Sequence, residues 1–179
     1  MNAADEAAGA IARGLTEHTA PMGEAEFERL YSATAGPILG YLTAVSGRRD
    51  VAEDLLQEAY CRFLAQGPAR SGLEAEAARR YLFRIASNLL RDRWRMGDGQ
   101  PFTEPAESGV AANYDTTLEV QAMLQHLNPK ERTLLWLAYV EGMDHAEIAA
   151  ATGLGRLSVR TLLFRARGRA RRLLEGELR

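Results

Sequence analysis

The stretch from Asp144 to Arg167 reads DHAEIAAATGLGRLSVRTLLFRAR. Asp144 and Glu147 have the three-residue spacing of a capping box, which predicts the start of a short helix. Gly153 follows that helix and can adopt a positive φ, as a tight turn requires. A second helix is then expected from Arg156, and the spacing of the whole stretch predicts a helix-turn-helix.

The second of these helices combines an apolar face with basic flanks. Residues 153–174 contain seven arginines and no acidic residue, although the whole chain has a formal net charge of -2. At about 100° per residue the arginines fall on both sides of the apolar stripe. This pattern suits a helix in the major groove of DNA, and the alternative is two packed helices with a solvated basic face. The apolar stripe consists of Val159, Leu162, Leu163, Ala166, Ala170 and Leu173.

Length and composition limit the classes of protein. The 179 residues, 46% of them hydrophobic, suffice for one medium domain or two small ones. No apolar run approaches the roughly 18 residues that span a bilayer, and the N-terminus lacks the features of a signal peptide. Cys61 is the single cysteine, so it cannot form an intrachain disulfide, which fits a reducing cytoplasm. We expect Cys61 to be packed within a helix rather than reactive.

The residues that would indicate an enzyme or a metal site are scattered. His18, His126 and His145 lack ligand spacing with one another or with Cys61. The chain has no phosphate-cradling glycine loop and no recognisable pair of nucleophile and base. We therefore expect no catalytic residue, no metal, no cofactor and no small-molecule substrate.

Charge divides the chain into segments. Residues 79–95 contain six arginines, and a second basic island lies at residues 156–172. Between them, residues 97–116 hold glycines, prolines and acids without periodic apolar signal, which predicts a flexible linker. Residues 1–23 are small and acidic and are expected to form a loose tail. Two basic islands on either side of an acidic stretch indicate two surfaces that face one polyanion.

The segment 24–96 predicts three helices. Apolar residues recur at helical spacing from Glu24, with a break or kink expected at Gly36-Pro37 and a stop at Ser46-Gly47. Asp50 and Glu53 resemble a capping box that opens the next helix. The apolar face of that helix consists of Leu55, Leu56, Ala59, Phe63 and Leu64. The third helix, rich in arginine, places Leu82, Ile85, Ala86, Leu89 and Leu90 toward a core.

The segment 117–179 predicts a second helical domain. It begins with a helix near Thr117, and a further helix starts at Asn128, where Pro129 suits the first helical position and Glu131 completes a cap. Gly142 is expected to end that helix. The sequence shows no convincing strand, so the predicted fold class is all-α, with two small helical domains at 24–96 and 117–179.

The ordered set of these blocks resembles a sigma factor of the extracytoplasmic-function (ECF) group. FERLYSATAGPILGYL, DVAEDLLQEAYCRFL and YLFRIASNLLRDRWR are similar to sigma region 2, and the block from Leu127 to Leu174 is similar to region 4. The resemblance covers about residues 24–174. It implies a bacterial initiation factor that binds core RNA polymerase, through its beta and beta-prime subunits, and promoter DNA.

The resemblance assigns roles to three sets of residues. In region 2, Asp54, Gln57 and Glu58 would dock on the polymerase clamp. The basic helix would bind the minus-ten element, with the loop at residues 67–74 forming much of a pocket for an extruded base. For strand melting it offers only the aromatics Tyr81, Phe83 and Trp94, and the alternative for some of them is a place in the core. Its nontemplate-strand contacts would be Arg80, Arg84, Asn88, Arg91 and Arg95. The region 4 helix would read the minus-thirty-five element through Arg156, Ser158, Arg160, Thr161 and Arg165.

Two positions depart from the family pattern. Leu157 stands where the family usually has glycine, and Leu162 where arginine is common. Two other functions stay open beside the sigma factor: a stand-alone helix-turn-helix regulator, and a sigma-like decoy that binds an anti-sigma factor. The resemblance also implies an anti-sigma partner and a cytoplasmic protein that such a partner can hold at the membrane.

Overall fold

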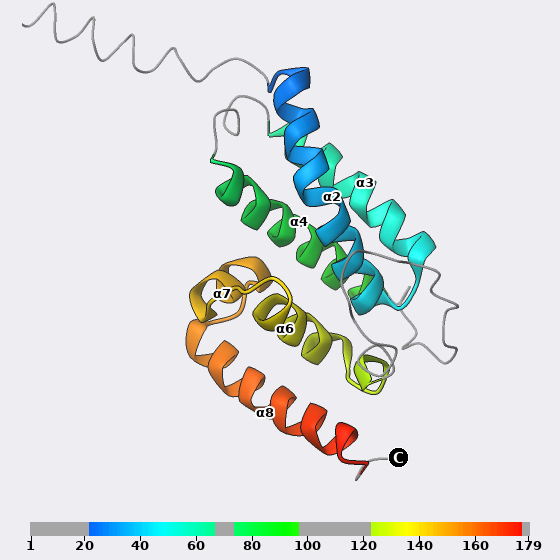
Figure 1. Ribbon diagram of the computed structural model, residues 1–179, viewed down its shortest axis with the longest axis vertical. Helices are drawn as coiled ribbons and strands as arrows, with labels where there is room; N and C mark the ends of the chain where they lie inside the picture. The colour runs from blue at the N-terminus through cyan, green and yellow to red at the C-terminus, as the bar shows by residue number, and fades with distance from the viewer. Residues whose placement is uncertain (1–21, 67–73, 97–122, 177–179) are drawn as a thin grey trace, which may run out of the picture.

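The computed structural model describes residues 22–66, 74–96 and 123–176, and its regular secondary structure within these ranges is helical. The N-terminal half holds α2 (Glu24–Ser46), α3 (Arg49–Ala65) and α4 (Ala75–Arg95). The C-terminal half holds α6 (Pro129–Tyr139), α7 (His145–Thr152) and α8 (Arg156–Leu174). Figure 1 shows the two sets stacked, with α4 facing α7 and the end of α2 near α6. The all-α prediction is confirmed.

The predicted linker at 97–116, the helix start near Thr117 and nearly all of the predicted tail lie outside the described residues. Among the helices that the structure describes, none is long and apolar enough to cross a membrane.

The core of the N-terminal half is built from large side chains of all three helices. Tyr41 of α2, Phe63 of α3 and Phe83 of α4 are fully or almost fully buried, and the rings of Tyr41 and Phe83 meet edge to face at 5.6 Å. The Tyr41 hydroxyl lies 2.9 Å from the Ser87 hydroxyl, so this buried polar atom has a partner. Burial raises the pKa of Tyr41, which keeps the hydroxyl neutral and able to donate.

Helix α2 begins and ends where the sequence predicts, but it is not interrupted. It starts at Glu24 and ends at Ser46, and Gly47, with a φ of 74°, makes a left-handed cap that donates its N–H to the Thr43 carbonyl. Pro37 lies inside the helix, so of the break or kink expected at Gly36-Pro37 the break does not occur. Burial of Ile38, Tyr41 and Leu42 beyond the proline offsets its lost hydrogen bond.

Helix α3 corrects two details of the prediction. It starts at Arg49 rather than after Asp50, and its N-cap makes no side-chain hydrogen bond. Asp50 instead pairs with Arg48, and Glu53 with Arg49, so no capping box forms. The predicted apolar face is buried except for Leu64, which is 44% exposed and lies beside the core stripe rather than in it.

The helix starts of the C-terminal half follow the sequence closely. Asn128 caps α6 and Asp144 caps α7, each in a complete capping box with the glutamate three residues later. Gly153 has a φ of 71° and forms the turn between α7 and α8. Helix α6 ends at Tyr139, and Gly142, with a φ of 66°, forms the turn that follows. The helix-turn-helix is thus present.

Substituting Pro37→Ala is expected to stabilise the protein by about 1–3 kcal/mol. The change restores the N–H that pairs with the carbonyl of Ala33 and removes the ring that crowds it. Urea and thermal unfolding measure the effect. Pro129→Ala is the matched control, because a proline at the first position of α6 interrupts no hydrogen bond and should change stability little. A less stable Pro37→Ala protein would mean that the ring's packing outweighs its backbone cost.

Candidate nucleic-acid and polymerase interface

The arginines of α4 form one row because the opposite face of the helix is in the core. All five residues predicted to face the core are buried. The five residues predicted to bind the minus-ten strand recur at spacings of three and four, which places them on one side of the helix over about 22 Å. They are Arg80, Arg84, Asn88, Arg91 and Arg95, of which the arginines are exposed and Asn88 is half-buried.

Helix α7 packs against this arginine row. Arg80 forms an ion pair with Glu147, and Arg91 donates from Nη1 to the Thr152 carbonyl at 2.8 Å. Arg91 also donates from Nη2 to the Asn88 side chain at 2.7 Å. Two of the predicted DNA-binding arginines are therefore held by the helix-turn-helix domain.

Gly153, the turn residue of the helix-turn-helix, allows Arg91 of α4 to approach the end of α7 closely. A Cβ added at Gly153 would lie 3.1 Å from Nη1 of Arg91, and the positive φ already disfavours a side chain there. Gly153 therefore serves two purposes: it turns the chain between α7 and α8, and it leaves room for Arg91 at the C-terminal end of α7. That end carries a partial negative charge, which favours a guanidinium.

Two buried charged residues complete the contact between the halves, and the sequence analysis identified neither of them. The carboxylate of Glu141 is 1% exposed, pairs with Arg79 of α4 and accepts a hydrogen bond from the indole of Trp136 at 3.0 Å. Burial raises the pKa of the Glu141 carboxyl, and Trp136 and Arg79 oppose that shift.

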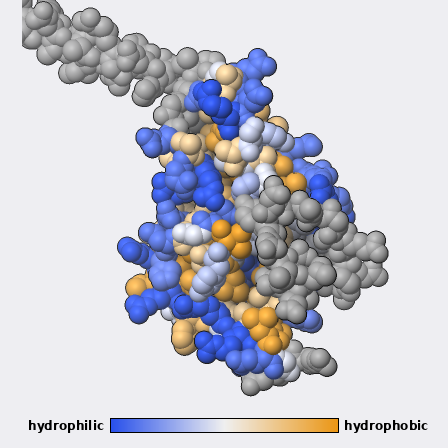
Figure 2. All heavy atoms as spheres, viewed as in Figure 1, coloured by the Kyte–Doolittle hydropathy of each residue, from blue (hydrophilic) through white to orange (hydrophobic). Residues whose placement is uncertain are grey.

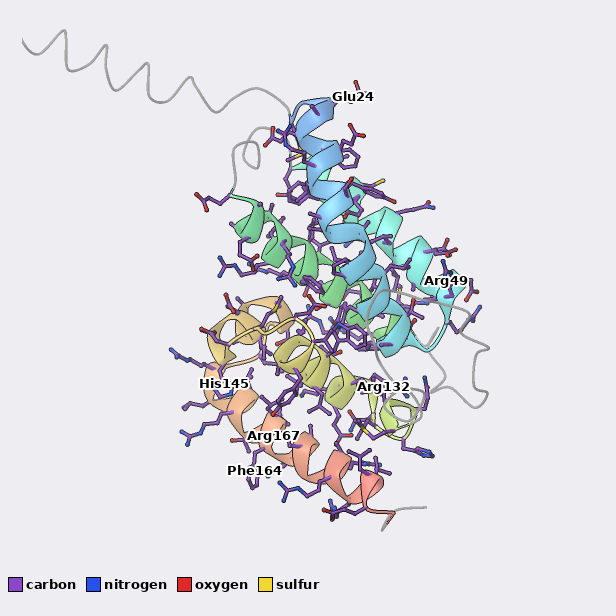
Figure 3. The ribbon with its side chains drawn as sticks, viewed as in Figure 1. Glu24, Arg49, Arg132, His145, Phe164 and Arg167 are labelled. Carbon is purple, nitrogen blue, oxygen red and sulfur yellow. The ribbon has the colours of Figure 1, made fainter. Side chains whose placement is uncertain are left out.

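Arg132 of α6 is only 4% exposed and links the halves through backbone carbonyls. It donates to the carbonyls of Leu127 at 2.9 Å, Gln125 at 3.2 Å and Val45 of α2 at 3.3 Å. Figure 3 labels Arg132 where α6 approaches the end of α2. Burial lowers the pKa of its guanidinium.

Region-2 aromatics are less available than the sequence indicated. Phe83 is fully buried in the core, while Tyr81 and Trp94 are half-buried. Phe83 is thus excluded as a strand-melting residue unless the core opens. The loop predicted to form the base pocket, at residues 67–74, lies outside the described residues apart from Glu74.

Helix α3 presents an exposed acidic face. Asp54, Gln57 and Glu58, the residues predicted to dock on polymerase, are all exposed. Glu58 forms an ion pair with Arg62 at 2.7 Å, a surface pair worth at most about 1 kcal/mol and so easily exchanged for a partner's contact. Cys61 is also exposed, so the prediction that it is packed is wrong: it faces the polar side beside Arg62.

Helix α8 is anchored by its apolar stripe and exposes its basic flanks. Val159, Leu163 and Ala166 are buried, while Leu162, Ala170 and Leu173 are half-buried. The Thr161 hydroxyl donates to the Leu157 carbonyl at 3.2 Å, so part of its capacity is used within the helix. Figure 2 shows the α8 end of the molecule as hydrophilic with hydrophobic residues interspersed. The predicted DNA contacts are all exposed: Arg156, Ser158, Arg160, Thr161 and Arg165.

The exposed charged side chains of α3, α4 and α8 suit a binding surface. The residues that the structure describes contain no cluster of three or more histidine, cysteine or acidic side chains able to hold a metal ion. A helix-turn-helix with a basic second helix, joined to a second basic helix beside an acidic one, defines a DNA-binding protein of the transcription machinery.

Comparison with known proteins gives the family. Residues 30–99 match Sigma-70 region 2, and residues 117–169 match Sigma-70 region 4. The chain is 31% identical over 159 residues to the ECF RNA polymerase sigma factor SigL of Mycobacterium tuberculosis, covering 83% of this chain and 88% of that protein. It is 27% identical over 176 residues to the ECF RNA polymerase sigma factor BldN of Streptomyces coelicolor, covering 89% of this chain and 65% of BldN. The chain belongs to the ECF family of RNA polymerase sigma factors.

Two solved structures share the fold. One is the sigma factor RpoE in complex with the anti-sigma factor NepR from Bartonella quintana, with a TM-score of 0.68 and 20% identity over 84% of this chain and 97% of that one. The other is CnrH in complex with the cytosolic domain of CnrY, with a TM-score of 0.61 and 22% identity over 87% and 92% of the respective chains.

Substituting Glu147→Gln is expected to free the arginine row of α4. Glutamine keeps the oxygen that caps the Asp144 N–H but removes the charge that holds Arg80. Binding of a fluorescent single-stranded DNA to the free protein should tighten about two- to fivefold, because an exposed ion pair is worth up to about 1 kcal/mol.

Glu28→Gln is the control for this experiment. Glu28 is an exposed carboxylate of α2, so its replacement removes one negative charge without touching Arg80. Equal affinities for the two variants would show that Glu147 does not restrain the row.

Proposed function

We propose that this sigma factor uses its three exposed surfaces for three successive tasks. Asp54, Gln57 and Glu58 of α3 dock on core RNA polymerase, at its beta and beta-prime subunits. The arginine row of α4 then holds the melted minus-ten strand, and α8 reads the minus-thirty-five element. The polymerase performs the chemistry, so the chain needs no catalytic residue or cofactor, and it acts in the cytoplasm where the polymerase and promoter DNA are.

The observation that carries this proposal is the presence of two separate basic helices, each oriented by its own buried face. A stand-alone regulator would bind DNA through α8 alone. That function would not account for the arginine row of α4 or the acidic face of α3. Single-stranded DNA suits α4, because a row of guanidinium groups binds a phosphate backbone without reading base edges. Duplex DNA suits α8, which projects from a helix-turn-helix.

An anti-sigma factor is the second proposed partner. The two solved relatives described above are complexes of a sigma factor with such a protein. For this chain, a partner that stabilises the contact of α7 with α4 would keep Arg80 and Arg91 turned toward α7. That contact uses N–H donors of both guanidinium groups, so fewer donors remain for phosphates.

Run-off transcription on fragmented genomic DNA tests the proposed function directly. Matched core polymerase is assayed with and without the protein. New starts that share two spaced upstream elements are the expected result. With active core and folded protein, no new starts would favour the decoy or the stand-alone regulator, which polymerase binding and duplex binding then distinguish.

The double substitution Asp54→Ala/Glu58→Ala is expected to weaken polymerase binding about tenfold or more, since it removes two charged contacts. The fold should be unaffected because both side chains are exposed. Glu28→Ala, which removes an exposed carboxylate of α2, is the control. Affinity is measured by titrating core polymerase. Equal affinities of all three proteins for polymerase would refute the docking assignment.

Substituting Arg160→Ala is expected to reduce use of the upstream element by about 1–3 kcal/mol if the guanidinium contacts a guanine through two hydrogen bonds. Holoenzyme binding is compared on promoters that differ at single upstream positions. A loss confined to one position indicates base readout. A uniform loss on every sequence would assign Arg160 to a phosphate instead.

A further inference from the structure

Two large apolar side chains lie exposed on the outer face of α8. Leu157 is 82% exposed and Phe164 is 70% exposed. They are seven residues apart, so they lie about two turns apart on the same side of the helix. This side is opposite the buried stripe of Val159, Leu163 and Ala166. In Figure 3 Phe164 points away from α6, and the described residues leave this face of α8 exposed.

Arginines flank this apolar pair on both sides. By helical register Arg160 and Arg167 lie on one flank and Arg165 on the other, and the segment 156–174 has no acidic residue. A partner that covers this face must therefore be anionic and must also carry apolar groups between its negative charges. The major groove of DNA meets both conditions: phosphates line its rims, and the 5-methyl group of thymine is its apolar feature.

We propose that Leu157 and Phe164 read thymine methyl groups in the upstream promoter element. The proposal rests on the assignment of α8 as the helix that enters the duplex. Neither side chain donates or accepts a hydrogen bond, so methyl contact is the only base readout open to them. Seven residues of helix rise about 10.5 Å, which equals about three base-pair steps. The two thymines therefore lie within about three base pairs of each other, while the arginines bind phosphates or guanines beside them.

The test begins with the reconstituted holoenzyme and a pool of duplex DNA in which the upstream segment is random. Bound duplexes are recovered and sequenced, and thymine is expected at two positions about three base pairs apart. Each thymine is then replaced singly by deoxyuridine, which removes only the methyl group. Loss of one buried methyl should weaken binding about fourfold at each position.

Each side chain is assigned to its thymine by combining an alanine substitution in the protein with a deoxyuridine substitution in the DNA. Leu157→Ala should abolish the effect of deoxyuridine at one of the two positions and leave the other effect intact, and Phe164→Ala should do the reverse. Leu174→Ala removes an exposed leucine from the last turn of the same helix and should preserve both effects. All three side chains are exposed, so unfolding curves should coincide with that of the parent protein.

The outcomes separate this proposal from the proposed function. If the holoenzyme enriches no sequence, α8 does not read DNA and both fail. If the holoenzyme enriches an element but binds the thymine and deoxyuridine duplexes equally well, only the methyl readout is refuted. The same holds if both alanine variants still prefer thymine to deoxyuridine at both positions. Unchanged discrimination together with lost binding to a protein partner would assign the face to protein docking, which also overturns the proposal.

Discussion

The burial of the apolar face of α4 is the constraint on which the rest of the arrangement depends. Leu82, Phe83 and Leu90 are almost completely enclosed, so the helix cannot rotate without burying an arginine and exposing a core residue. Either change costs several kcal/mol, because an unpaired buried charge and a lost large side chain are both expensive. The direction of the arginine row is therefore fixed by the core, and the row in turn determines where the C-terminal half can pack.

Two arginines at the edge of the contact between the halves have partners that a nucleic acid could replace. Arg80 faces the carboxylate of Glu147, and Arg91 faces the carbonyl of Thr152. A DNA phosphate would give Arg80 another anionic partner and would give Arg91 an anionic partner in place of a neutral one. The buried pair of Glu141 with Arg79 and the buried Arg132 hold the same contact from inside. Polymerase docking or a partner protein can then decide which arrangement is populated.

The local structure was largely predictable from sequence because it depends on local rules. The capping boxes at Asn128 and Asp144, the turn at Gly153 and the apolar stripes of α4 and α8 all form as their spacing indicates. The two failures have different causes. The proline inside α2 is tolerated because the tertiary core extends past it, whereas Asp50 pairs locally with Arg48, two residues before it, instead of capping a helix.

The buried charges could not be predicted from the chain, because burial of a charged residue depends on partners distant in sequence. Arg132 donates to a carbonyl of α2, and Glu141 pairs with an arginine of α4. Nothing in the neighbouring residues of either one indicates such a partner. The exposed residues of the candidate site were predictable as a set, since amphipathic register gives their direction. The engagement of Arg80 and Arg91 by α7 was not, because it depends on how the two halves pack.

The composition of α8 raises a problem that the exposed apolar pair resolves. Arginines that bind phosphates do so on any sequence, so a helix with seven arginines over residues 153–174 gains affinity for DNA in general, apart from any arginine that reads a guanine. Specificity requires groups whose contact with the wrong base is less favourable than their contact with the right base. Leu157 and Phe164 do this in the proposed readout, because either one placed against a polar base edge removes water from groups that it cannot satisfy. A strongly basic helix therefore needs apolar side chains on the face that meets the bases more than a weakly basic helix does.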